Sequence, residues 1–498
     1  MRMLLINPTL AGESFSQHLG ITSLASYINA RTPHRAEIVD FGFRRCGWRE
    51  YLDSRVRRFD PDAFGVTVAS PNLFAAKTII DVLRPYGRPI LGGGTHCTVM
   101  AEQALDDLGC DAICIGEGEF TLSEYLDRLA AGAGPDGIAG LLYRRNGQII
   151  RGEPRPVNQR IDDLPDDDWS LWDDVQLHLD VFGMLSFYGT RGCPHECSYC
   201  TSATLREILP GNFRLCSPEL YAARVGRQFE RFGPRGFRVA WLWDQVFTRD
   251  AAWLERFCTE YRRLGLHRRL PYSVYVRGDE LDEERARLLA ESGCIIIRVG
   301  FESGDDWMRC DVYQKRISRD SYRECVRLCR KYGLSVTGYY ILGGPGETWR
   351  SMWNTYRLAR ELAVDTPTFY VYKPLPRTAA VKKLHDLGGY FTDVWHRKVL
   401  DIRFGGMVYT PHLSPRQVEM FQMVCALRFL PIVLLRQLWR LGPRYFSLFW
   451  GFVRRGRRHG VGIADSYRHF TYTISIQGAT RAWRKRMAAA DRAGKAAG

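Results

Sequence analysis

Apolar residues in the first 130 positions fall into short runs that alternate with amphipathic segments. Segments 18–28 and 73–83 carry apolar residues three and four positions apart, the spacing of one helix face. Five other runs have the length and composition of strands: 3–7, 36–40, 63–68, 89–91 and 112–116. Strands that alternate with helices predict βαβ units and a parallel sheet. Glycines gather after these strands, at the sheet edge where ligands lie in open α/β folds.

The same alternation returns between residues 183 and 384, with longer and more regular strands. Six apolar runs are separated by helix-like segments: 187–190, 237–243, 272–276, 294–300, 334–341 and 368–372. Six βα units predict a partial TIM-type barrel, and the chemistry of such barrels lies at the carboxyl ends of the strands.

A segment rich in Gly, Ala and Asp joins the two regions, and a helical region follows them. Within the joining segment, 141–150 has the pattern of a hairpin about Asn146-Gly147, which we expect to carry the chain from one domain to the next. Past residue 400 the pattern is helical, at 417–441 and 446–453. The predicted fold class is α/β in four parts: residues 1–135, a linker at 136–180, a barrel at 181–400 and a helical extension at 401–498.

The net charge of +15 is concentrated in the carboxyl-terminal tail. From Arg436 onward, fourteen Lys and Arg residues stand against Asp465 and Asp491, so this tail carries +12 and the rest of the chain +3. A nearly neutral body argues against a nucleic-acid groove through the predicted barrel, and for a basic appendage. No nucleic-acid partner is expected.

Two interpretations of the basic extension remain open. Its helices could pack on the barrel, or they could form a peripheral membrane surface with Arg454, Arg455, Arg457 and Arg458 on anionic headgroups. The apolar run 429–435 is too short to span a bilayer, and the apolar start of the chain is too short for a signal peptide. We therefore expect a cytoplasmic protein, peripheral to the inner face of the membrane if the tail binds lipid.

Cys193, Cys197 and Cys200 form the strongest chemical motif in the chain. Three thiolates can hold three irons of a [4Fe-4S] cluster and leave the fourth iron open, whereas a structural zinc normally takes four protein ligands. Chance clustering, or a zinc knuckle completed by His195, are the alternatives. The other cysteines are scattered in apolar contexts, as in a reducing compartment. Cys325 and Cys329 therefore favour buried apolar positions over a second cluster.

The triplet, with Gly192 before it and Tyr199 before its last cysteine, resembles the radical S-adenosylmethionine (radical SAM) enzymes. The resemblance implies a [4Fe-4S] cluster whose open iron is chelated by SAM. It places the SAM contacts near the cysteines and at the ends of the predicted strands: Tyr199, Asp244, Arg277, Glu302, Ser303, Gly343 and Gly344. Gln245 departs from the family, which often has a second acidic residue there. A helix cap is the alternative role for Glu302 and Ser303. Arg298, in a core strand, should pair with a carboxylate, either that of SAM or a structural one.

The first domain resembles the cobalamin-binding domain of B12-dependent radical SAM enzymes. The resemblance is carried by Asn7-Pro8, Leu19-Gly20-Ile21, Asp40, Gly92-Gly-Gly-Thr-His96 and Gly116-Glu-Gly-Glu119. It implies these cobalamin contacts: Gln17, Gly20, Thr67, Ser70, Gly92, Gly93, Gly94, His96, Gly116, Glu117 and Gly118. The chain lacks the Asp-x-His-x-x-Gly motif of other B12 proteins. His96 is therefore expected to line the pocket rather than to bind cobalt.

The two resemblances together imply an enzyme with a [4Fe-4S] cluster, SAM and cobalamin. Such an enzyme cleaves SAM reductively to a 5'-deoxyadenosyl radical and methylates an unactivated carbon through methylcobalamin. Its partners would be a small-molecule or lipid-like substrate and an electron donor such as flavodoxin or ferredoxin. No catalytic side chain is identified beyond the cluster cysteines. The alternatives are a B12-dependent oxidative cyclisation or rearrangement without methyl transfer, and a non-catalytic cobalamin or redox-sensing module.

Overall fold

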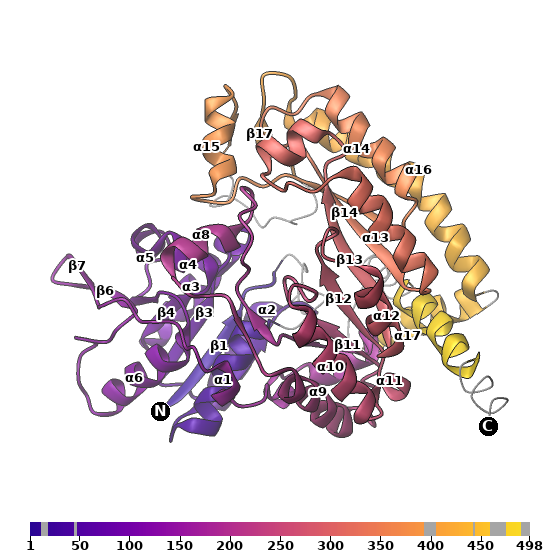
Figure 1. Ribbon diagram of the computed structural model, residues 1–498. Coiled ribbons are helices and arrows are strands. Elements are labelled where there is room, and N and C mark those ends of the chain that lie inside the picture. The colour runs from indigo at the N-terminus through magenta and orange to yellow at the C-terminus, as the bar shows by residue number, and fades with distance from the viewer. Residues whose placement is uncertain (11–17, 44–46, 393–404, 442–443, 459–474, 490–498) are drawn as a thin grey trace.

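A computed structural model describes residues 1–10, 18–43, 47–392, 405–441, 444–458 and 475–489. Two α/β domains lie side by side, and helices of the carboxyl-terminal extension cover the outer side of the second (Figure 1). This arrangement agrees with the fold class that the sequence predicts.

The first domain is a parallel sheet with helices on both faces. Its strands are β1 (Arg2–Asn7), β2 (Arg35–Asp40), β3 (Ala63–Thr67), β4 (Ile90–Gly93) and β5 (Ala112–Cys114), in the spatial order β2-β1-β3-β4-β5. Its helices are α1 (Leu19–Arg31), α2 (Trp48–Phe59), α3 (Leu73–Leu83), α4 (Thr95–Val99), α5 (Ala101–Leu108) and α6 (Gly118–Ala130). Met3 and Leu5 pack with α1 and α6, whereas Leu4 and Ile6 pack with α2, α3 and α5. All five predicted strands and both predicted helices, α1 and α3, are present, whereas α2, α4, α5 and α6 are additions that the apolar pattern did not predict.

The predicted hairpin is present, but it belongs to the first sheet. Strands β6 (Leu141–Arg145) and β7 (Gln148–Arg151) pair antiparallel, and β6 also pairs with β5, so the sheet has seven strands. Asn146 and Gly147 both have positive φ, as a tight hairpin turn requires. The sheet therefore continues beyond the boundary expected at residue 135. The domain boundaries at 135, 180 and 400 stay predictions.

The second domain is an open, six-stranded parallel sheet of the partial-barrel kind. Its strands are β8 (Met184–Phe187), β11 (Val239–Leu242), β12 (Tyr272–Val276), β13 (Cys294–Glu302), β14 (Ser335–Leu342) and β15 (Thr366–Val371), and their spatial order follows the chain. The helices between them are α9 (Pro218–Phe232), α10 (Ala251–Arg263), α11 (Leu266–Arg269), α12 (Glu283–Glu291), α13 (Arg319–Lys331) and α14 (Trp349–Leu362). Five of the six strands coincide with predicted runs, whereas β8 ends at Phe187, where the predicted run 187–190 begins. Strands β8, β11, β12 and β13 are almost entirely buried, as in a sheet covered on both faces, and the edge strand β15 is only partly buried.

Short elements after the first and last strands of this sheet border its carboxyl-terminal edge. The antiparallel pair β9 (Thr190–Arg191) and β10 (Arg214–Leu215) encloses the cysteine loop and α8 (Thr201–Ile208). Beyond β15 come α15 (Ala379–Asp386) and the pair β16 (Tyr390–Phe391) and β17 (Val408–Tyr409).

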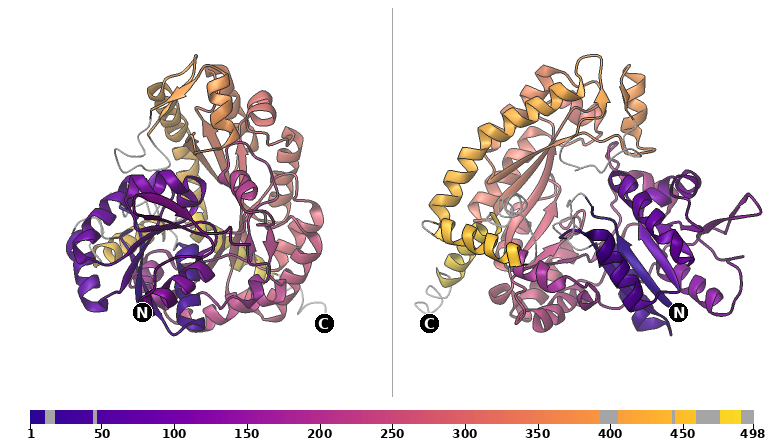
Figure 2. Two further views of the ribbon diagram at one scale, coloured as in Figure 1. Left: turned by 90° about the vertical axis from the view of Figure 1, so that its left-hand side faces the viewer. Right: turned by 180° about the vertical axis from the view of Figure 1, so that it is seen from behind.

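The carboxyl-terminal helices pack on the second domain. Helix α16 (Pro415–Leu441) buries Phe421, Cys425 and Phe429, and Gln422 Nε2 donates to the carbonyl oxygen of Phe369 on the edge strand β15 at 2.7 Å. It lies on the side away from the first domain (Figure 2). Helix α17 (Arg444–Arg458) follows, and a helix over 475–489 packs with α7 (Val175–Phe182) under the barrel. Among the described residues, no helix is both long enough and apolar enough to cross a bilayer.

Trp172 joins the connecting segment to the first domain, and its substitution tests this junction. The side chain is 2% exposed, and its Nε1 donates to Thr22 Oγ1 of α1 at 2.8 Å. We expect Trp172→Ala to lose about 3–5 kcal/mol of stability, because it leaves a cavity and removes a buried hydrogen bond, although the Thr22 hydroxyl still donates to the carbonyl oxygen of His18. Trp172→Phe should lose less. Trp450→Ala is the control, because Trp450 is 58% exposed. Thermal melting followed by circular dichroism measures the effect, and equal melting of the two alanine variants would contradict it.

Candidate functional site

The three motif cysteines lie in one loop between β9 and α8, at the carboxyl-terminal edge of the second sheet. All three are partly exposed, whereas the other described cysteines are buried except Cys310. Gly192 opens the loop at φ +77°, and a Cβ there would lie 2.5 Å from the carbonyl oxygen of Asn212. Burial raises the pKa of the Cys193 thiol to about 11. Metal binding is therefore needed to hold this sulfur as thiolate at neutral pH.

The surroundings of the loop favour a polynuclear cluster over a single zinc ion. His195, the ligand expected in the zinc alternative, has its Nε2 2.9 Å from Glu280 Oε1. Arg277 Nη1 lies 4.0 Å from Cys197 Sγ and supplies positive charge beside it. The loop thus fits an iron-sulfur cluster held by three thiolates.

Glu302 connects the cysteine loop to the end of β13. Its Oε1 accepts from Tyr199 Oη and from Lys315 Nζ, both at 2.8 Å, and Lys315 also donates to the carbonyl oxygen of Gly300 at 2.7 Å. Glu302 is 6% exposed and has φ +58°, in the left-handed region, where the register of β13 and β14 shifts. Burial and the Glu302 charge raise the pKa of Tyr199, so its hydroxyl stays protonated and donates. Sequence reasoning missed Lys315, which follows an irregular turn and belongs to no motif.

The remaining predicted SAM contacts also lie at strand ends, each with a local partner. Asp244 accepts from Gly189 N at 2.7 Å and Tyr221 Oη at 2.8 Å, and burial raises its pKa to about 6. Ser303 Oγ lies 3.1 Å from Thr355 Oγ1 and accepts from Asp305 N at 3.1 Å, as a cap would.

Gly343 and Gly344 donate their N–H groups to the buried Glu347 carboxylate, whose pKa burial raises to about 8. The roles of Tyr199, Asp244, Arg277, Glu302, Ser303, Gly343 and Gly344 toward SAM stay predictions. The carboxylate partner expected for Arg298 also stays a prediction; the guanidinium lies 4.4 Å from the Trp241 ring centroid and 5.6 Å from that of Tyr275.

A cavity of about 510 Å³ lies between the two domains. The second domain lines it with Tyr188, Arg191, Trp243, Gln245 and Leu205, among others. The first domain contributes the glycine-rich strand ends, including these predicted cobalamin contacts: Gly20, Thr67, Gly92, Gly93, Gly94, Gly116, Glu117 and Gly118. The cavity therefore joins the predicted cobalamin contacts to the segments that flank the cysteine loop, whereas the three cysteines and the predicted SAM contacts are not among its lining residues.

Ser70 and His96 lie apart from the lining of this cavity. Both are buried, and Ser70 Oγ lies 2.9 Å from His96 Nδ1. Gln17 lies outside the described residues. His18 lines the cavity instead, caps α1 by accepting from Ile21 N at 3.3 Å, and has a pKa that burial lowers to about 4. His18 is therefore a neutral imidazole at the cavity wall.

The cavity suits a bulky, flat ligand. A Cβ on Gly93 would meet only Cys114, at 3.9 Å, so the absent side chain leaves open space over the strand ends. Gly94 has φ +96°, and a Cβ there would approach Val68 O to 2.8 Å. Apolar side chains such as Leu5, Leu24 and Leu122 complete the wall. This combination fits a corrin ring, for which the backbone must approach closely.

A buried ion-pair network, which we call the interdomain clamp, joins the two cofactor regions. It consists of Arg191 and Arg214 on β9 and β10, and Glu117 and Glu119 after β5. Arg191 pairs with Glu119 at 2.5 Å and with Glu117 at 3.1 Å, and Arg214 pairs with Glu117 at 2.5 Å. Arg191 precedes Cys193 by two positions. Sequence reasoning placed Glu117 as a cobalamin contact and missed the clamp, because nothing local relates these charges.

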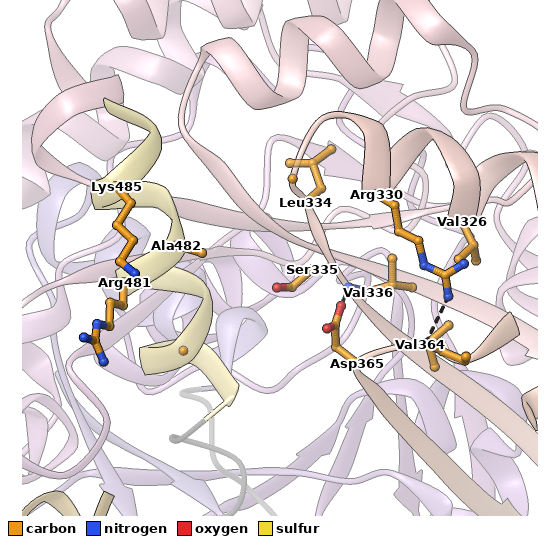
Figure 3. A pocket seen from close by; sticks show the side chains of 13 residues that line it. Val326, Arg330, Leu334, Ser335, Val336, Val364, Asp365, Arg481, Ala482 and Lys485 are labelled. Carbon is orange, nitrogen blue, oxygen red and sulfur yellow. Dashed lines mark hydrogen bonds between the residues drawn. The ribbon is translucent and has the colours of Figure 1, made fainter. Parts of the chain in front are cut away.

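A second cavity, of about 740 Å³, lies at the opposite end of the second sheet (Figure 3). It is bounded by the starts of β14 and β15 and by the helix over 475–489, with Arg330, Asp365, Arg481 and Lys485 around it. Chemistry in parallel barrels belongs to the carboxyl ends of the strands. The smaller interdomain cavity is therefore the candidate active site.

Substitution of Arg191 tests the clamp. Arg191→Met would leave Glu119, 4% exposed, without its partner. We expect a loss of about 3–5 kcal/mol of stability and a lower cobalamin content per chain, with part of both restored in Arg191→Met/Glu119→Gln. The control Arg231→Met breaks an exposed pair with Asp168 and should change stability by less than about 1 kcal/mol. Melting temperature and cobalamin absorbance are the measurements. Equal values for the Arg191 and Arg231 variants would refute the clamp.

Known proteins resemble this chain in sequence and in fold. An uncharacterised methyltransferase of Pyrococcus horikoshii is 26% identical over 363 residues, which are 72% of this chain and 76% of that protein. The anaerobic magnesium-protoporphyrin IX monomethyl ester cyclase of Cereibacter sphaeroides is 24% identical over 348 residues, 68% of this chain and 55% of the cyclase. The structure of the radical SAM methyltransferase TsrM from Kitasatospora setae, with cobalamin and a [4Fe-4S] cluster bound, has a TM-score of 0.66 at 20% identity and covers 78% of this chain and 76% of TsrM.

Two family models match the two domains separately. The radical SAM superfamily matches residues 187–359, and the B12 binding domain matches residues 12–126. The two matches imply three cofactors: a [4Fe-4S] cluster and SAM from the radical SAM domain, and cobalamin from the B12 binding domain. The site geometry and the two matches agree, and the chain belongs to the radical SAM enzymes that carry an amino-terminal B12 binding domain.

Proposed function

We propose that the protein is a cobalamin-dependent radical SAM methyltransferase that adds a methyl group to an unactivated carbon of a small molecule. The observation that carries this proposal is the interdomain cavity, because the cobalamin-type glycines form one wall and the strand ends beside the cysteine loop form the other. The similarity to a protein named as a methyltransferase supports methyl transfer over the alternatives.

When bound, the cluster with SAM supplies a carbon-centred radical, and cobalamin supplies a methyl group. The protein positions the cofactors and the substrate relative to one another. Cys193, Cys197 and Cys200 would hold the cluster and leave one iron without a protein ligand. Arg277 lies 4.0 Å from Cys197 Sγ, and its positive charge offsets part of the thiolate charge. Tyr199 and Lys315 hold Glu302 at the strand end beside them.

A band of aromatic side chains inside the barrel supports a substrate with a flat or apolar surface. Ring centroids are 5.3 Å apart for Trp243 and Tyr275, 6.3 Å for Tyr275 and Tyr339, and 5.9 Å for Tyr339 and Tyr370. All four side chains are partly exposed, and Trp243 also lines the interdomain cavity. Aromatic faces of this kind bind planar or apolar groups and exclude water from the reacting atoms.

The test is SAM cleavage by the reduced, reconstituted protein with methyl-labelled SAM and candidate aromatic substrates. We expect 5'-deoxyadenosine and a labelled, methylated product. Cys193→Ala, Cys197→Ala and Cys200→Ala should each lose cluster iron and SAM cleavage, because a three-thiolate site keeps no spare ligand. Cys310→Ala is the control, since Cys310 is also partly exposed but lies outside the triplet.

The labelled product also separates methyl transfer from its alternatives. A changed substrate without label would favour a cyclisation or rearrangement, for which the similarity to the anaerobic cyclase is the supporting observation. Cobalamin binding without any SAM cleavage would favour a non-catalytic module. Iron loss in Cys310→Ala equal to that in the triplet variants would contradict the assignment of the cluster ligands.

We further propose that the carboxyl-terminal helices contact the inner face of a membrane. Five apolar side chains on α16 are between 44% and 64% exposed: Met420, Met423, Leu427, Leu430 and Leu435. Exposed Arg454 and Arg457 follow on α17. Apolar and basic side chains on neighbouring helices are typical of interfacial binding.

Liposome flotation of the full chain tests this contact. We expect co-flotation with vesicles that contain anionic lipid, and a loss of at least tenfold in the bound fraction for Met423→Glu/Leu427→Glu. Gln422 lies on the face of α16 that packs on the barrel. Met423 and Leu427 are exposed, so we expect their substitution to leave α16 folded. Binding that is equal for neutral and anionic vesicles, or unchanged in the double variant, would remove the proposal.

A further inference from the structure

Asp40, Asp174 and His178 form a buried cluster at the junction of the two domains. Asp40 ends β2 of the first sheet, Asp174 precedes α7, and His178 follows one turn later on that helix. The three residues are 4%, 6% and 1% exposed. One ligand atom from each lies within 4.8 Å of the others, and Asp174 Oδ2 is 3.5 Å from His178 Nε2.

The polar atoms of Asp174 and His178 make no hydrogen bond of good geometry. Both carboxylate oxygens of Asp174 and both ring nitrogens of His178 are buried, and their one contact is the ion pair of Asp174 Oδ2 with His178 Nε2 at 3.5 Å. Buried polar atoms in this state cost roughly 1–3 kcal/mol each, and more when charged. A helix cap could explain Asp174 alone, but its carboxylate makes no side-chain cap hydrogen bond. The unsatisfied atoms therefore point to a ligand that accepts electron pairs.

The third residue of the cluster is already oriented as a metal ligand would be. Asp40 Oδ2 accepts from Asn7 Nδ2 at 2.7 Å and from Thr9 Oγ1 at 2.8 Å, while Oδ1 accepts from Gly42 N at 2.8 Å. Such outer hydrogen bonds fix the direction of a ligating carboxylate. The ring centroids of Phe43, Trp172 and Phe182 lie 4.8, 6.0 and 6.1 Å from that of His178, so apolar side chains surround this imidazole.

We propose that Asp40, Asp174 and His178 bind a divalent transition-metal cation that joins the two domains. One nitrogen and two carboxylate donors suit Zn²⁺ or Mn²⁺, whereas Mg²⁺ and Ca²⁺ prefer oxygen donors alone. Two ligands on a tetrahedral zinc lie about 3.4 Å apart, close to the observed Asp174–His178 separation. The three residues do not line the interdomain cavity. The second oxygen of Asp174 also makes no hydrogen bond and can supply the fourth donor that a structural zinc normally takes. The cation is therefore structural, and the proposal does not depend on the reaction catalysed.

Elemental analysis of the full chain tests the site. The protein, reconstituted with its cluster and cobalamin, is equilibrated with Zn²⁺ or Mn²⁺ and passed over a chelating resin. We expect about one equivalent of zinc or manganese per chain beside the iron and cobalt. Asp174→Asn and His178→Gln should retain at least tenfold less of it, with iron and cobalt unchanged. His34→Gln is the matched control, because His34 is also buried and lies 2.9 Å from a carboxylate, that of Asp127.

Two results would overturn the proposal. One is a wild-type protein that retains less than a tenth of an equivalent, which would leave the cluster as a buried proton-sharing group. The other is retention by the Asp174 and His178 variants equal to that of His34→Gln. Zinc-edge X-ray absorption of the wild type keeps the test decisive if the variants fail to fold. Oxygen and nitrogen ligands support the site, whereas sulfur ligands assign the zinc to the cysteine loop and refute it.

Discussion

The arrangement of the two cofactor regions depends on the interdomain clamp. Arg191 and Arg214 flank the cysteine loop on β9 and β10, and they pair with Glu117 and Glu119 after β5. Arg214 and Glu119 are almost fully buried, where a charge without its partner would be strongly destabilising. These ion pairs therefore form in only one placement of the two sheet edges relative to each other. That placement creates the cavity in which the glycine-rich strand ends face Trp243 and Gln245.

A second polar centre orders the cysteine loop itself. Glu302 occupies a left-handed backbone position at an irregularity of β13, where it accepts from both Tyr199 and Lys315. Gly300 permits this geometry, since a Cβ there would lie 2.1 Å from Glu302 Oε1. Backbone strain of this kind persists when the surroundings over-determine it, and it is concentrated at functional sites. Hydrogen bonds thus connect the strand end, the loop and the lysine next to the thiols.

Much of the fold could be predicted because its strands are local apolar patterns. Ten of the eleven parallel strands coincide with predicted runs, β8 lies just before its predicted run, and the three cysteines are neighbours in sequence as well as in space. The hairpin at Asn146-Gly147 was predictable as a turn, but its pairing with β5 was not. Which strand a hairpin pairs with depends on which edge of the sheet is free in the folded protein. Helix α2 was missed since its mean composition is polar and only Leu52, Arg55 and Val56 are buried.

The sequence by itself determined the chemistry available to this protein: three thiolates in one loop, glycines at strand ends, and the alternation that builds two parallel sheets. Each of these features is formed by residues that are close in sequence, so their spacing along the chain is enough to predict them. Only the tertiary structure decided which charges meet. Arg191 and Glu119 are 72 positions apart, and Asp40 ends β2 of the first sheet whereas His178 lies on α7, far along the chain. Pairing across such separations is set by how buried surfaces pack, and no local pattern encodes it.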